Sequence, residues 1–94
     1  MDELNEGDRG DFEFRTATGS RYEISLADGG NTMRRIPRDA GGELRRDREV
    51  IAILAFAPIR VGEMAIFTVE ALSPNGALAT MRWTSAVDSI ERSA

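Results

Sequence analysis

The sequence predicts an all-β fold: a small antiparallel barrel or roll of five to six strands, SH3-like or similar in topology, with one long Arg/Gly-rich loop. Residues 12–16 and 22–26 alternate apolar and polar side chains with the period of two that half-buried strands show. The alternation returns at 64–71, and a short segment at 86–91 adds a last strand. A chain of 94 residues is too short for two independent cores. We therefore expect a single β-domain over residues 11–92.

The first two strands are expected to form a hairpin around the turn-forming residues 18–20. A two-residue loop would leave the aromatic and aliphatic rows on different faces. A three-residue loop pairs Ala17 with Arg21 and places Phe14 opposite Ile24. Because a slip of one residue reverses the faces of a strand, burial of both rows favours the longer loop.

The middle of the chain contains a third strand, a long loop and an ambiguous apolar run. A turn at 27–31 leads into an expected strand at 32–36, and an Arg- and Gly-rich loop follows through residue 48. The continuously apolar residues 50–56 fit either a central strand covered on both faces or the end of a helix that begins near Glu43. Their β-branched side chains and a following proline favour the strand.

A second hairpin is expected around residues 73–76, whose sequence Ser-Pro-Asn-Gly is typical of a type I turn with a left-handed glycine after it. In the matching register Val69 lies opposite Met81 and Phe67 lies opposite Trp83. This register puts all four side chains on one face. The sequence therefore predicts Trp83 in the core, facing Phe67.

Composition removes most kinds of active site, because the chain has no histidine, no cysteine and no lysine. The usual zinc, copper, haem and iron–sulfur sites lack their ligands. A serine nucleophile has neither an imidazole nor an amine base, and a phosphate-binding P-loop lacks its lysine. Turn chemistry accounts for the Asp-Gly-Gly-Asn at 28–31, which lacks the ligand spacing of a calcium loop. We expect no enzyme, no cofactor and no metal.

The expected location is the cytoplasm, with no membrane partner. No apolar run approaches the roughly 18 residues that a membrane-spanning helix needs. Residues 1–10 are too acidic for a signal peptide, and the absence of cysteine fits a reducing compartment. With Leu4 as their one sizeable apolar residue besides the first methionine, residues 1–10 are expected to form a disordered acidic leader.

The formal net charge of −4 is unevenly distributed. Residues 1–13 carry six acidic side chains against one arginine, whereas residues 34–48 carry six arginines against three acidic side chains. We expect these arginines to form a partner-binding surface: Arg34, Arg35, Arg38, Arg45, Arg46 and Arg48. Guanidinium groups bind phosphates or acidic protein surfaces, and a solvated loop paired with its own acids is the alternative. Net acidity opposes nucleic acid, since long-range repulsion slows approach to a polyanion.

Three stretches carry a loose family resemblance: TGSRYEI at 18–24, RIP at 35–37 and TSAVDSIE at 84–91. They resemble small uncharacterised β-rich proteins of high-GC Gram-positive bacteria and their phages. The use of twelve arginines and no lysine agrees with a high-GC genome. The resemblance implies a cytoplasmic accessory protein and transfers no catalytic or binding residue.

These observations favour a small non-enzymatic protein-interaction module, phage-encoded according to the resemblance, that binds and modulates a host protein. The arginine loop or an exposed sheet edge would make the contact. Two alternatives stay open. One is a nucleic-acid-binding β-barrel that uses the same arginines. The other is a small structural subunit, either of a virion or of a homo-oligomer joined through sheet edges.

Overall fold

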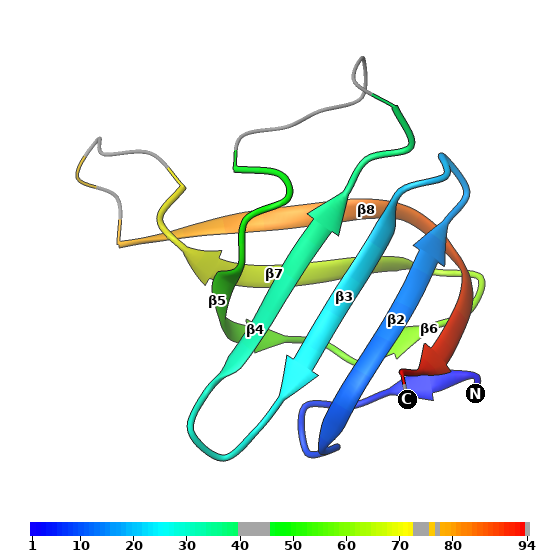
Figure 1. Cartoon of the computed structure of the whole chain (residues 1–94), viewed down its shortest axis with the longest axis horizontal. Coiled ribbons are helices and arrows are strands. Elements are labelled where there is room, and N and C mark those ends of the chain that lie inside the picture. Colours follow the sequence, from blue (N-terminus) through cyan, green and yellow to red (C-terminus); the bar gives the residue numbers. More distant parts are fainter. Residues whose placement is uncertain (40–45, 73–75, 77, 94) are drawn as a thin grey trace.

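A computed structural model describes residues 1–39, 46–72, 76 and 78–93, and all its regular elements are strands. The strands are β1 (Glu3–Leu4), β2 (Gly10–Thr16), β3 (Arg21–Leu26), β4 (Asn31–Ile36), β5 (Ile51–Phe56), β6 (Ile59–Arg60), β7 (Met64–Glu70) and β8 (Ala79–Arg92). Six of them form a closed barrel in the order β2-β3-β4-β5-β7-β8, antiparallel throughout. Figure 1 shows β2, β3 and β4 crossing in front of β7 and β8. The predicted small antiparallel barrel is confirmed.

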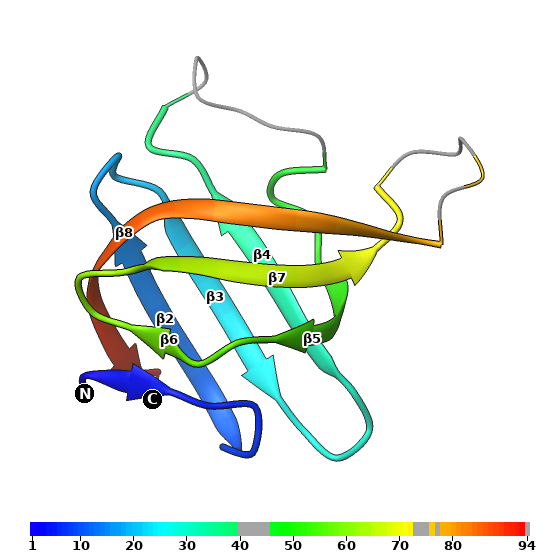
Figure 2. The same cartoon turned by 180° about the vertical axis from the view of Figure 1, so that it is seen from behind.

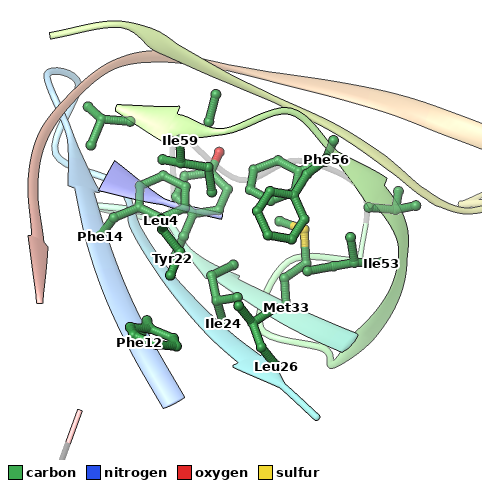
Figure 3. Close-up of a cluster of buried hydrophobic side chains, with 14 of the residues drawn as sticks. Leu4, Phe12, Phe14, Tyr22, Ile24, Leu26, Met33, Ile53, Phe56 and Ile59 are labelled. Atoms are coloured by element: carbon green, nitrogen blue, oxygen red, sulfur yellow. The ribbon is translucent and has the colours of Figure 1, made fainter. Parts of the chain in front are cut away.

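The inward rows of the strands fill the barrel with aromatic and branched side chains (Figure 3). Phe14 stacks on Tyr22 with ring centroids 4.6 Å apart and on Phe67 at 6.1 Å. Phe56 packs against the same Phe67 ring at 5.7 Å. The aromatic cluster therefore joins β2, β3, β5 and β7 across the interior, and the rows predicted for β2, β3 and β7 are the buried ones.

The β2–β3 hairpin has a three-residue loop, as predicted, but the loop is residues 17–19 instead of 18–20, and the register differs from the prediction by two residues. Thr16 and Ser20 close the loop, and Phe14 lies opposite Tyr22 rather than Ile24. The cause is Gly19, whose φ of 90° requires the last position of the loop, where a left-handed residue completes this turn. A shift of two residues keeps every side chain on its predicted face.

The apolar run before Pro58 forms the expected strand, β5, but the strand is covered on one face only. A bulge between Ile53 and Ala55 shifts the register against β7. Ile53 and Phe56 therefore both point inward, while Leu54 is 56% exposed. Coverage of both faces was the wrong part of this prediction.

The β7–β8 register differs from the prediction by one residue, which reverses the faces of β8. Phe67 lies opposite Arg82 instead of Trp83, and Ile66 takes the place opposite Trp83. Trp83 is 56% exposed and Arg82 is buried, so the core assignment of Trp83 and of Met81 was wrong. The turn residues 73–75 lie outside the described part of the chain.

β8 runs as one curved strand where two were expected, the second strand of the hairpin around residues 73–76 and a short strand at 86–91. Its first half pairs with β7 and its second half with β2, which closes the barrel (Figure 2).

The N-terminal residues pack against the barrel, where the composition predicted a disordered leader. Leu4 is fully buried, as is Ile59 in β6, with which it pairs. The Glu6 carboxylate accepts a hydrogen bond from the backbone N–H of Phe56 at 3.0 Å. Glu3 pairs with Arg60 at 2.5 Å, and this hydrogen bond lowers the pKa of Glu3. One buried apolar side chain and two polar contacts of acidic side chains thus hold this segment against the barrel.

Candidate functional site

The arginines predicted to form one surface are distributed over different parts of the fold. Arg34 lies on the outer face of β4 and pairs with Glu23 at 2.5 Å. Arg46 pairs with Glu70 at 2.9 Å and with Glu49 at 3.4 Å.

The other four arginines of the set have different surroundings. Arg35 is buried, whereas Arg38 and Arg48 are exposed, and Arg45 lies outside the described residues. The six arginines therefore do not form a single guanidinium surface in the part of the chain that the structure describes.

A buried ionic cluster joins β4, β8 and the residue Asp47, which lies between β4 and β5 in the sequence. Asp47, whose side chain is 2% exposed, pairs with Arg35 and lies 3.8 Å from Nη1 of Arg82. Arg35 also donates hydrogen bonds to the Tyr22 hydroxyl at 3.1 Å and to Ser20 Oγ at 2.9 Å. Burial raises the pKa of Tyr22 and lowers that of Arg82.

The backbone on both sides of Asp47 has an unusual conformation, and the Asp47 side chain points into the interior. Arg46 and Arg48, on either side, have φ values of 59° and 68°, a conformation uncommon for residues other than glycine. The Arg48 N–H donates a hydrogen bond to the Arg35 carbonyl at 2.8 Å, which holds the backbone at Arg48 beside β4. Because its charged groups engage one another, we assign the cluster a structural role: it fastens the long loop to β4 and β8.

A pocket of about 340 Å³ lies over the outer faces of β2, β3 and β4. Its lining includes Asp11, Ser25, Thr32 and the ion pair of Glu23 with Arg34. Phe12, Ile24, Met33 and Val50 add apolar parts to the lining, and Glu23 and Arg34 are already paired with each other. We assign this pocket no ligand. No group of three acidic residues placed to hold a metal occurs within the described residues. In the same residues no helix is long and apolar enough to cross a membrane.

The outer face of β7 and β8 carries an apolar surface. Trp83 lies opposite Ile66, and two residues along β8, Met81 lies opposite Thr68. Met64 is exposed at the beginning of β7, and Leu54 is exposed at the bulge of β5, the strand that pairs with β7 on its other edge. We call this surface the Trp83 face, defined by these residues: Leu54, Met64, Ile66, Met81 and Trp83.

The Trp83 face is similar in area to the largest apolar patch of a typical monomeric protein. Trp83, Met81, Met64 and Leu54 are each between 52% and 59% exposed. At the usual areas of such side chains they present on the order of 400 Å² to solvent, within the range of surface patches that often have a function. Figure 2 views the molecule with β7 and β8, the strands that carry most of this face, in front.

Comparisons with protein families, curated proteins and solved structures found no match for this chain. The candidate site is therefore defined by the chain's own geometry. The sequence analysis placed Met81 and Trp83 inside because apolar side chains usually face the core, and these two lie on the same face of β8. Knowing that Arg82 has a buried acidic partner would have corrected this assignment. That partner, Asp47, is far from Arg82 in the sequence, so no local pattern reveals it.

Proposed function

We propose that this protein is a small non-enzymatic interaction module that binds another protein through the Trp83 face. The observation that carries the proposal is the exposure of Trp83 and Met81 side by side on one face of the barrel. Tryptophan and methionine are enriched at protein interfaces, and tryptophan is among the residues that most often dominate binding energy. The chain has a single tryptophan, and it stands outside the core.

The scaffold supports such a role because the face lies on paired strands rather than on a loop. Ile66 and Trp83 are cross-strand partners, and β7 is held on its other edge by β5. A face on a closed barrel changes little when a partner binds, so little conformational entropy is lost on binding. The setting implied by the sequence resemblance, a cytoplasmic phage accessory protein acting on a host protein, is part of this proposal.

The role predicted for the arginines stays a separate prediction, and the structure gives these arginines different surroundings. Arg34 and Arg46 are already held in ion pairs, and Arg35 is buried. Arg38 and Arg48 are exposed.

Nucleic acid is the less favoured partner. The exposed Trp83 offers one aromatic platform of the kind that single strands stack on. A polyanion would, however, meet a chain of charge −4, several of whose guanidinium groups are neutralised by carboxylates.

The test is affinity capture from a lysate of the encoding cell, followed by binding measurements with the purified partner. Changing Trp83 and Met81 to alanine together should weaken that partner's binding by about a hundredfold or more, as expected for a central interface residue. Changing Arg34 to alanine, on the opposite side of the barrel, should leave binding within about threefold. Undiminished binding by the Trp83/Met81 variant would refute the proposal.

A further inference from the structure

We propose that the partner segment seated on the Trp83 face is an amphipathic α-helix whose polar side is basic. This inference rests on the proposed function and names the chemistry of its partner. It follows from the dimensions of the face, from the charges at one end of it and from what the chain itself can offer.

The dimensions of the face match a helix. Leu54, Thr68 and Met81 lie on three neighbouring strands, and strands are about 4.8 Å apart, so the apolar surface is roughly 10 Å wide. An α-helix with its side chains is about 10–12 Å across. Along β7 the surface extends from Met64 to Thr68, so it covers two to three helical turns. Packing of a helix on one face of a sheet is a common way to cover it.

The charges at the Met64 end of the face are acidic. Glu63 precedes Met64, and its backbone carbonyl accepts a hydrogen bond from Val87, the neighbour of Asp88. Both carboxylates are on exposed residues, and within the described part of the chain neither lies within ion-pair distance of an arginine. The hydrogen bond with Glu3, its ion-pair partner, raises the pKa of Arg60, and Glu63 contributes to this shift at longer range. At the other end Glu70 is paired with Arg46. Lysines or arginines beside the apolar stripe of a bound helix can therefore pair with Glu63 and Asp88 at the Met64 end of the face.

Net charge points the same way. A chain of charge −4 attracts a basic segment and repels an acidic one at long range. A second copy of this chain is disfavoured for two reasons: it has the same negative charge, and its regular elements in the described ranges are all strands. It has no helix there to place on the face.

Trp83 provides the readout, because it is the only tryptophan in the chain and lies in the proposed contact. The probes are three synthetic peptides of about 18 residues, or five helical turns. The first has leucine and lysine in helical periodicity, and the second has glutamate in place of lysine. The third has the composition of the first in strict alternation, which favours a strand. Burial of the indole should shift its emission to shorter wavelengths.

We expect the helical leucine–lysine peptide to shift the Trp83 emission and to bind at least tenfold more tightly than the other two. The double variant Glu63→Gln/Asp88→Asn should weaken its binding about three- to tenfold, as expected for loss of two exposed charge contacts. The matched control, Asp11→Asn/Glu91→Gln, removes two exposed carboxylates near the β2–β8 seam and should change binding less than twofold.

Four results would overturn the inference: equal binding of the glutamate peptide, equal binding of the alternating peptide, equal effects of the two double variants, or no emission shift with any peptide. An emission shift that depends only on the protein's own concentration, with dimers in sedimentation, would assign the face to a second copy instead. The proposed function is judged separately, because capture that depends on Trp83 and Met81 supports it whatever the peptides do.

Discussion

Removal of the Asp47 carboxylate should be the most destabilising single change of a charged residue in this protein. Asp47 is 2% exposed, and the two arginines beside it are 9% and 7% exposed. At the 3.8 Å between Asp47 and Arg82, an effective dielectric constant of about 20 gives an attraction of roughly 4 kcal/mol. Breaking buried pairs of this kind costs about 3–5 kcal/mol, because the remaining charge stays buried. Asp47→Ala should therefore lower the free energy of unfolding by about that amount.

The measurement is urea unfolding followed by far-ultraviolet circular dichroism, with two comparison variants. Glu49→Ala removes an exposed partner of Arg46 and should cost less than about 1 kcal/mol. Asp47→Ala combined with Arg82→Met should be less destabilised than Asp47→Ala alone, since one buried charge is then also gone. If Asp47→Ala unfolds within 1 kcal/mol of the wild type, the cluster does not fasten the loop and the reasoning from burial is wrong.

Two further substitutions and one titration test the fold. Phe67→Ala should cost about 3–5 kcal/mol in the same assay, because the ring is fully buried among three aromatic neighbours, and a cost below 1 kcal/mol would contradict the core. Leu4→Ala should lower the free energy of unfolding by about 2–4 kcal/mol, because the side chain is fully buried. An unchanged melting temperature would support the prediction that residues 1–10 are disordered. Tyr22, the only tyrosine, should titrate by absorbance above its ordinary pKa of 10.0, because burial disfavours the phenolate. Its contribution to stability is present below pH 10 and is lost as the pH rises through the raised native pKa, and a native midpoint at or below 10 would contradict its burial.

Local pattern predicted the rows of side chains better than it predicted their pairing. The alternation in β2, β3 and β7 identified Phe14, Tyr22 and Phe67 as core residues because one face of each strand must leave water. The register needed finer information. At the first hairpin the left-handed requirement of Gly19 displaced the pairing by two residues, without consequence for burial.

At β8 the same kind of error was decisive for the candidate site. A slip of one residue exchanged the faces, so that Trp83 was assigned to the interior, where the structure places Arg82 instead. A buried arginine is tolerated only with a carboxylate beside it, and here the carboxylate comes from Asp47 in the long loop. Such a pairing depends on tertiary structure, which neither periodicity nor turn signals contain. Leu4 shows the same limit, since a single apolar residue makes no pattern.

The most direct test of the central claim is acrylamide quenching of Trp83 emission in the free protein and in its complex with the captured partner. The chain has one tryptophan. The emission therefore reports Trp83 alone if the partner has no tryptophan, or if the partner's tryptophans are replaced by a non-fluorescent analogue. The account predicts efficient quenching in the free protein and strong protection in the complex. Equal quenching in both, with the partner demonstrably bound, would show that binding occurs elsewhere and would contradict the assignment of the Trp83 face.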